Sequence, residues 1–274
     1  MARSLFVVCA CQVPSTAEEW QKIADDFLAR WNFPMCVGAM DGKHIMLQKP
    51  TLSGSTFYNY KHRFSVHLLA VVDANYRFVY VDAGCQGRIG DAGVYQHSAM
   101  CVALEHNTVD IPSAQSLPQT EVLVPYVLVA DDAFPLKSYI MKPYAHRGLN
   151  DMERIFNYRL SRARRVVENA FGILAARFRV FRSAMEVCPS KARDVVLAAT
   201  VLHNFLRDRR AAEMSTAASE SADIAERDSL EVPRGMAQLQ PCLQKATMNA
   251  KAIRNKFATY FMQEGQVDWQ WNVV

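Results

Sequence analysis

The chain has 274 residues, half of them hydrophobic, and a formal net charge of +4. A chain of this length and composition buries a sizeable core, which excludes a globally disordered protein. Its seven cysteines are odd in number and include no CxxC pair, which excludes a disulfide framework and fits a reducing compartment. No apolar run approaches the roughly 18 to 20 residues that a membrane span needs, so no membrane partner is expected.

The N-terminal part predicts a helix followed by three antiparallel strands. The helix opens at Ser15 or Thr16, because each is followed three residues later by a glutamate in a capping box. The first strand is an apolar run from Cys36 that carries Asp41 near its end. Residues 65–73 and 77–83 are the other two strands, joined by a hairpin turn.

The next stretch alternates loops and elements. Residues 84–93 hold four glycines and predict a loop, with Asp91 at the N-cap of a helix over 94–104. Residues 122–130 are continuously apolar, which is typical of a strand buried on both faces, and they stop at Asp131-Asp132. A short helical stretch up to Met141 is expected after them.

A helix rich in arginine comes next. From Arg154 to Arg182 the chain holds eight arginines and a single acidic residue, Glu168. A last helix is predicted over 190–207, starting beside Pro189. The composition of 211–229, rich in Ala, Ser and Glu, is typical of a flexible segment, and a short helix is expected around 245–261.

Four carboxylates stand at places from which they can converge: Asp41, Asp91, Asp131 and Glu168. Side chains at strand ends and on a covering helix can meet above a sheet, where an open α/β sheet binds its ligand. Oxygen ligands suit Mg²⁺ or Mn²⁺, and two such ions can activate a water and stabilise the leaving oxygen of a phosphodiester. The pattern favours a metal site that acts on nucleic acid.

Each aspartate also has a structural explanation. Asp41 with Gly42 is an ordinary turn dipeptide, Asp91 an ordinary helix cap, and Asp131 a strand-end residue. Asp132 is the alternative to Asp131 at the same strand end. Three histidines are expected to be core or hydrogen-bonding residues rather than metal ligands: His44, His62 and His67.

Glu168 and its basic neighbours allow two interpretations. Glu168 lies four residues after Arg164 and three after Arg165, so an ion pair on the helix surface accounts for it as well as a metal does. The basic side chains would bind backbone phosphate, with a solvated surface as the alternative. Those expected to contact nucleic acid are Arg162, Arg164, Arg165 and Lys43, and Lys61 and Arg63 are weaker candidates.

Five segments form a connected set of motifs: GAMDGKHI at 38–45, GRIGDAGV at 87–94, ADDAFPL at 130–136, the arginine-rich helix at 156–180, and VLHNFL at 201–206. In this order they resemble motifs of PIF/Harbinger-type transposases and the domesticated nucleases derived from them, the HARBI1-like group of the DDE superfamily. The resemblance covers roughly residues 13–208. Ala130 replaces a usual glycine, and Gly90 stands where Ser, His or Asn is common, but neither change removes a ligand.

The resemblance implies an α/β fold of the RNase H-like type, a mixed β-sheet flanked by helices. It implies a divalent cation, Mg²⁺ or Mn²⁺, held by Asp41, Asp91, Asp131 and Glu168, with Asp41, Asp131 and Glu168 as the catalytic set. It also divides the chain into an N-terminal lead and helix, a catalytic domain, and a flexible C-terminal tail with a short helix, at residues 1–32, 33–208 and 209–274.

Two functions remain open. The first is a metal-dependent endonuclease or transposase catalytic domain that cleaves DNA phosphodiester bonds, in the nucleus or the cytoplasm. The second is a domesticated or truncated transposase without activity that binds DNA or protein. Relatives carry an upstream helix-turn-helix region that this chain is expected to lack, so a separate DNA-binding protein is an expected partner. All four carboxylates are present, which favours the enzyme.

Overall fold

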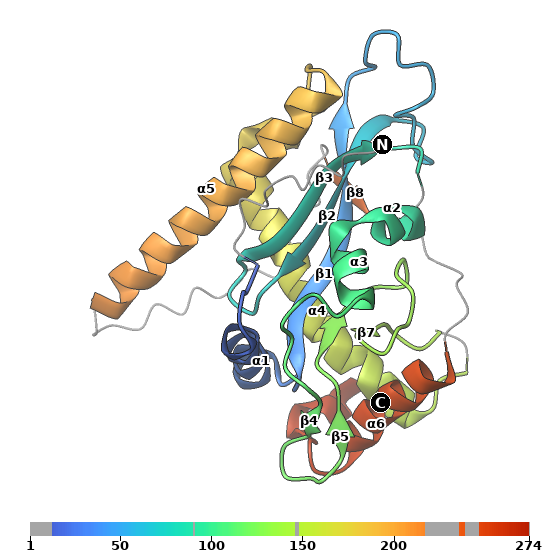
Figure 1. Ribbon diagram of the computed structural model, residues 1–274, viewed down its shortest axis with the longest axis vertical. Coiled ribbons are helices and arrows are strands. Elements are labelled where there is room, and N and C mark those ends of the chain that lie inside the picture. Colours follow the sequence, from blue (N-terminus) through green and yellow to red (C-terminus); the bar gives the residue numbers. More distant parts are fainter. Residues whose placement is uncertain (1–12, 90, 146–147, 217–235, 239–246, 274) are drawn as a thin grey trace.

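The computed structural model describes residues 13–89, 91–145, 148–216, 236–238 and 247–273. A mixed sheet with helices on both faces forms the body of the molecule, which confirms the RNase H-like α/β fold (Figure 1). The elements in chain order are α1 (Ala17–Trp31), β1 (Cys36–Leu47), β2 (Phe64–Val72), β3 (Phe78–Gln86), α2 (Asp91–His97), α3 (Ala99–Glu105), β4 (Gln115–Ser116), β5 (Leu123–Val124), β6 (Val127–Val129), β7 (Ile140–Met141), α4 (Asp151–Arg177), η1 (Arg179–Arg182), α5 (Pro189–Thr216), β8 (Met236–Gln238), α6 (Met248–Met262) and η2 (Asp268–Val273).

The sheet has the strand order β3-β2-β1-β6-β7. Strands β1, β2 and β3 are antiparallel neighbours, whereas β6 runs parallel to β1 and β7 parallel to β6. Strand β8 pairs with β1 along Lys43–Ile45, beyond the end of β6. All twelve residues of β1 are buried, so any polar side chain on this central strand is removed from water.

Helices cover the two faces of the sheet unequally. On one face α4 and α5 pack against β1, β2 and β3, and their apolar side chains form the larger core together with those of α6. On the other face α2 and α3 lie over the sheet (Figure 1). Helix α1 contributes Phe27 to the first core and Trp20 to the second. None of the helices in the described ranges has the length and apolarity that crossing a bilayer requires.

The long helix α4 begins at a well-formed cap. The side chain of Asn150 accepts a hydrogen bond from the Glu153 N–H, and the Glu153 carboxylate accepts one from the Asn150 N–H. From there Phe156, Val167 and Phe171 recur on one face and are buried, with Phe171 against Phe78 of β3. The apolar stripe therefore fixes which side of α4 faces the strands, and with it the direction of Glu168.

Some elements differ from those that the sequence predicts. The first strand runs on to Leu47, so Asp41 lies in the middle of β1 rather than near a strand end. The reason is that β2 pairs with β1 along Ala39–Leu47, which overrides the turn tendency of Asp41 and Gly42. The expected short helix up to Met141 is instead β7, an added strand beside β6.

The C-terminal segment packs on the same fold, and the short helix expected around 245–261 is α6. Helix α5 continues to Thr216, and α6 buries Phe257 and Phe261 against Phe33. These phenylalanines are spaced four apart and therefore share one face of α6. The segment 217–229, which was expected to be flexible, and the N-terminal lead 1–12 lie outside the described residues.

The VLHNFL motif at 201–206 in α5 forms hydrogen bonds to the edge strand β3. The Phe78 N–H donates to Oδ1 of Asn204, and Nδ2 of Asn204 donates to the Phe78 carbonyl, both at 2.8 Å. His203 Nε2 lies 2.8 Å from the Tyr76 carbonyl oxygen, and burial lowers the pKa of His203 to about 4, so its ring is neutral. Asn204 thus takes the place of a neighbouring strand at the edge of β3.

We expect Asn204→Ala to destabilise the protein by about 3 kcal/mol, because it leaves the buried N–H and carbonyl of Phe78 without partners. For a protein of this size that corresponds to a fall of roughly 6–12 °C in the unfolding midpoint, measurable by calorimetry. The neighbouring Phe205 is 56% exposed. Phe205→Ala is the matched control and should change stability by less than about 0.5 kcal/mol. Equal midpoints for the two variants would contradict the role assigned to Asn204.

Candidate active site

Two aspartates lie side by side on the face of the sheet that α4 covers. Strand β6 runs parallel to β1 with Val129 paired to Ala39, so Asp131 and Asp41 each stand two residues further along. Residues two apart in an extended chain share a face, and neighbouring strands are about 4.8 Å apart. Asp131 stands two residues past the end of β6, beside the continuing β1. Asp41 is 1% exposed and Asp131 is partly buried. The parallel pairing therefore places two carboxylates next to each other in a largely buried setting.

A backbone amide holds each aspartate in place. The Gly42 N–H donates to Oδ1 of Asp41 at 2.9 Å, and the Ala133 N–H donates to Oδ1 of Asp131 at 2.8 Å. The other oxygen of Asp41, Oδ2, is buried and accepts no hydrogen bond from any described residue. A buried acceptor in this condition fits a site that receives a positively charged ligand.

The environment makes both aspartates hard to ionise. Burial raises the pKa of Asp41, and Glu168 adds to the rise, whereas Lys43 and Arg164 oppose it. Burial, and after it the charge of Asp41, raise the pKa of Asp131 to about 6. Two neighbouring carboxylates that resist ionisation gain most from a cation between them. The arrangement is therefore electrostatically suited to binding positive charge.

Lys43 lies inside the site rather than on a nucleic-acid-binding surface. It is 4% exposed, and its Nζ lies 3.5 Å from Oδ2 of Asp41 and 5.7 Å from the centre of the Phe171 ring. The two-residue spacing from Asp41 was the available signal, because it places both side chains on one face of a strand. Lys43 supplies part of the positive charge that balances Asp41.

Helix α4 brings Glu168 and Arg164 over this face. Nη1 of Arg164 lies 2.8 Å from Oε1 of Glu168, and the two side chains are 18% and 31% exposed. The ion pair proposed as the structural explanation of Glu168 is thus present. Burial lowers the pKa of Arg164, but Glu168, Asp41 and Asp131 together outweigh burial and raise it. Arg164 is therefore within electrostatic reach of three carboxylates.

The other candidates have different surroundings, except that Asp132 adjoins Asp131 and helps to raise its pKa. Arg162 stacks on the ring of Trp269, 3.9 Å from its centre, and Arg165 is exposed on α4. Asp91 is the first residue of α2, and its side chain lies outside the described part of the structure. Asp132 contributes a backbone carbonyl that accepts a hydrogen bond from Lys142 at 3.1 Å.

A polar cluster lies elsewhere on the sheet, and the sequence did not predict that its members meet. His44 and His67 are buried with ring centres 4.2 Å apart, and Nδ1 of His44 lies 2.9 Å from the Ser65 hydroxyl. Burial lowers the pKa of His44 to about 3 and that of His67 to about 4. A Cβ on Gly87 would lie 2.5 Å from the Ser65 carbonyl oxygen, so glycine is required there. These two histidines are core residues, as expected, and they lie under the loop that leads to α2.

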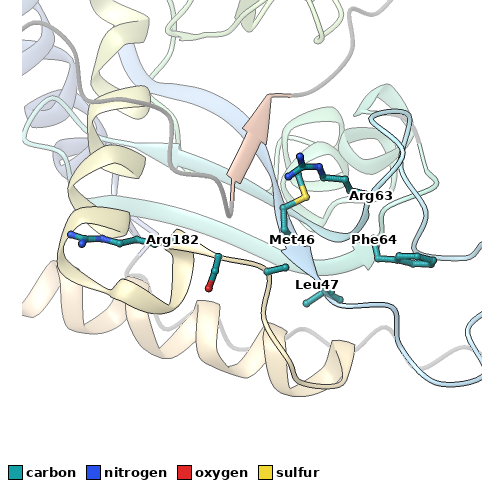
Figure 2. A pocket seen from close by; sticks show the side chains of 7 residues that line it. Met46, Leu47, Arg63, Phe64 and Arg182 are labelled. Carbon is teal, nitrogen blue, oxygen red and sulfur yellow. The ribbon is translucent and has the colours of Figure 1, made fainter.

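A surface pocket of about 480 Å³ opens beyond the end of β1 (Figure 2). Leu47 at its wall is six residues past Asp41, or about 20 Å along a strand, so the pocket is separate from the paired aspartates. Two exposed arginines border it, and one of them, Arg182, also donates to the Ala176 carbonyl at 3.0 Å. Its lining consists of Met46, Leu47, Arg63, Phe64, Arg182, Ser183 and Ala184.

Comparison with known proteins assigns the chain to a family. The model of the DDE superfamily endonuclease matches residues 40–204, more than half of the chain, and the matched stretch includes Asp41, Asp91, Asp131 and Glu168. The chain belongs to the DDE superfamily endonuclease family. The resemblance that the five motifs indicate is thereby confirmed.

The names of the curated relatives agree with this family. It is 27% identical to "Protein ALP1-like" of Arabidopsis thaliana over 197 residues, covering 69% of the chain and 48% of that protein. It is 25% identical over 195 residues to "Putative nuclease HARBI1" of Bos taurus and of Homo sapiens, covering 70% of the chain and 52% of those proteins. The chain thus spans about half the length of the curated relatives it matches. No solved structure matches it.

DDE endonucleases use divalent metal in general, so the residues of this chain can be tested for fit. Within the described ranges, no three acidic, histidine or cysteine side chains are gathered closely enough to hold an ion as they stand. The chemistry nevertheless fits: Asp41 and Asp131 are adjacent, and Oδ2 of Asp41 accepts no hydrogen bond from a described residue. Carboxylate oxygens are the ligands that Mg²⁺ and Mn²⁺ prefer.

Proposed function

We propose that the chain is the catalytic domain of a divalent-metal-dependent nuclease that cleaves DNA phosphodiester bonds. The observation that carries the proposal is the parallel pairing of β1 and β6, which sets Asp41 beside Asp131 beneath α4. Together with Glu168 they are the three described carboxylates of the family motif. Asp91 is proposed as a fourth ligand, on the strength of its motif alone.

The roles of the side chains follow from their positions. Asp41 and Asp131 would hold Mg²⁺ or Mn²⁺ from the sheet, and Glu168 would complete the site from α4. A cation bound there supplies charge that polarises the phosphodiester and promotes ionisation of the attacking water. Gly42 and Ala133 orient the two aspartates through their N–H groups, and Lys43 balances the charge of Asp41. None of these residues reads base sequence, so weak sequence preference is expected.

DNA is the proposed substrate because basic side chains are exposed on α4, near Glu168, and around the separate pocket about 20 Å further along β1. Arg165 on α4 is exposed, and Arg63 and Arg182 flank the pocket beyond β1 (Figure 2). Phosphate oxygens are the groups that such side chains bind. We also propose that a separate DNA-binding protein delivers the target. The protein would act in the nucleus, where the DNA lies.

Metal-dependent nicking of supercoiled plasmid tests the proposal. Wild-type protein should nick in Mn²⁺ or Mg²⁺ and lose this activity in a chelator. Glu168→Gln should lose more than about 100-fold, because even an outer partner of a metal ligand is worth 10- to 100-fold. Glu105→Gln is the matched control, since Glu105 pairs with Lys137 on the surface at 3.3 Å. Absence of nicking by wild-type protein with either metal would refute the proposal.

A second function is favoured by one observation. The Glu168 carboxylate is already paired with Arg164, and Lys43 lies beside Asp41, so the site holds positive charge from the chain itself. A domain that has lost catalysis and binds DNA or protein would have the same appearance. Calorimetric titration with Mn²⁺ separates the two functions, because the binding domain would show no heat that depends on Glu168.

A further inference from the structure

Arg164 is in an unusual position for an arginine of a proposed nucleic-acid-binding helix. Its Nη1 lies 2.8 Å from Oε1 of Glu168, and only 18% of the side chain is exposed. The partner is one of the proposed metal ligands, and the sheet beneath presents the other two, Asp41 and Asp131. Glu168 is therefore engaged by a cation that belongs to the chain, and this cation also acts electrostatically on Asp41 and Asp131.

The Arg164 guanidinium and a divalent metal ion cannot both bind these carboxylates closely. A guanidinium and a divalent ion a few ångströms apart repel each other strongly in a partly buried site. Coordination of Glu168 to a metal would also take away the oxygen that now pairs with Arg164. Arrival of the metal therefore requires one of the chain's own positive charges to withdraw.

Arg164, rather than Lys43, is the charge that is able to move. Lys43 is 4% exposed, sits on the central strand and lies against the Phe171 ring. Arg164 projects from a helix, is partly open to solvent and carries a long side chain that can turn outwards. Releasing Glu168 costs the energy of one partly buried ion pair, and this cost is what weakens metal binding.

We propose that Arg164 is a positioning residue that acts as an internal counter-cation, holding Glu168 until a divalent cation binds and then releasing it. The proposal rests on the metal site of the proposed function and adds a regulatory step to it. Arg164 keeps the carboxylates in place, and it weakens metal binding by the energy needed to displace it. Metal and guanidinium are thus competitors for the same site.

Titration calorimetry with Mn²⁺ at pH 8 and fixed ionic strength tests the competition. Arg164→Gln should bind Mn²⁺ roughly 10-fold more tightly than wild type, within the usual range of coupling between two ligands of one site. Arg154→Gln removes the same charge from the same helix at an exposed position, where Arg154 faces Asp151 at 3.9 Å. It should bind as wild type does. Equal or weaker binding by Arg164→Gln would overturn the proposal.

Thermal unfolding gives a readout that a purely structural ion pair would not share. Without metal, Arg164→Gln should unfold at a lower temperature than wild type, because the carboxylates have lost their counter-charge. With saturating Mn²⁺ this deficit should close, since the ion now supplies the charge. A deficit of the same size with and without Mn²⁺ would mean that Arg164 is only structural.

A measurement on wild-type protein keeps the test independent of how well Arg164→Gln folds. The side-chain NMR signal of Arg164, assigned by its loss in Arg164→Lys, should show faster rotation of the guanidinium when Mg²⁺ is added. An unchanged signal in protein that has bound Mg²⁺ would overturn the proposal. If neither wild type nor variant binds either metal, the proposed metal site itself has failed. Binding without any gain in Arg164→Gln rejects the counter-cation alone.

Discussion

Asp131→Asn is expected to abolish metal-dependent cleavage and, at the same time, to make the protein without added metal more stable. Asparagine keeps the oxygen that accepts the Ala133 N–H but removes the charge that lies beside Asp41. Loss of a proposed direct metal ligand should lower activity by more than about 100-fold. Relief of the repulsion between two carboxylates should raise the free energy of unfolding. Plasmid nicking and chemical denaturation measure the two effects separately.

The size and the pH dependence of this gain follow from the pKa of Asp131. It is about 6 in the folded protein, raised by burial and then by Asp41, and about 3.9 in an unfolded chain. The folded state binds this proton more tightly, so the carboxyl favours folding at low pH and that contribution is lost as the pH rises through 6. Asp131→Asn should therefore gain about 2 kcal/mol at pH 7.5, and about half of that at pH 5. A gain that does not change with pH would contradict this explanation.

Asp41→Asn is the informative comparison. It should lose cleavage as completely, but it leaves Lys43 almost fully buried without the carboxylate that lies 3.5 Å from it. Removing one partner of a buried pair is costly, because the other charge remains uncompensated. We therefore expect Asp41→Asn to be less stable than wild type at pH 7.5. Equal stabilisation by both substitutions would show that Lys43 does not balance Asp41.

The sequence predicts the parts of this site but not their relation to one another. Asp131 follows an apolar run and Glu168 stands alone among arginines, and both facts can be read from the chain. The neighbour of Asp131 depends on the pairing of β6 with β1, whose residues are about ninety positions apart. Local propensity carries no information about such a pairing, and only the family motifs connect the two segments.

The arginines of α4 show a second limit of prediction from sequence. Their number indicates a basic surface for nucleic acid, yet Arg164 pairs with Glu168 and Arg162 stacks on Trp269. Helical spacing gives the direction of each side chain but not what meets it there. The partner of Arg162 comes from η2, in the C-terminal segment 209–274 that was predicted to be a flexible tail with a short helix. Charge density on a helix is therefore a poor guide to which arginines reach solvent.

Arg159 of α4 lies in the protein interior, although arginine is usually exposed. It is 2% exposed, Nη1 donates to the Gly265 carbonyl at 3.1 Å and to Oε1 of Gln270 at 2.9 Å, and Nη2 donates to the Asn32 carbonyl. The guanidinium carbon also lies 4.4 Å from the centre of the Phe261 ring. Burial lowers the pKa of Arg159 to about 10, so it keeps its charge near neutral pH. One side chain thus joins the end of α1, the helix α4 and the C-terminal segment.

We expect Arg159→Met to lower the free energy of unfolding by about 4 kcal/mol. Methionine fills much of the space but removes the hydrogen bonds to the Gly265 and Asn32 carbonyls and to Oε1 of Gln270, and each such loss costs about 1–3 kcal/mol. The unfolding midpoint should fall by roughly 8–16 °C. Hydrogen exchange should rise first in α6 and η2, because the contacts made by Arg159 hold that segment to α4.

Arg154→Met is the control for Arg159→Met, since it removes an exposed arginine from the same helix and should change stability by less than about 0.5 kcal/mol. If Arg159→Met leaves the exchange of α6 unchanged, the C-terminal segment is held by its phenylalanines alone. If α6 exchanges early while β1 and β2 stay protected, the arginine is the connection. Arg159 would then stabilise the fold, which is a different role from the one proposed for Arg164 at the carboxylates.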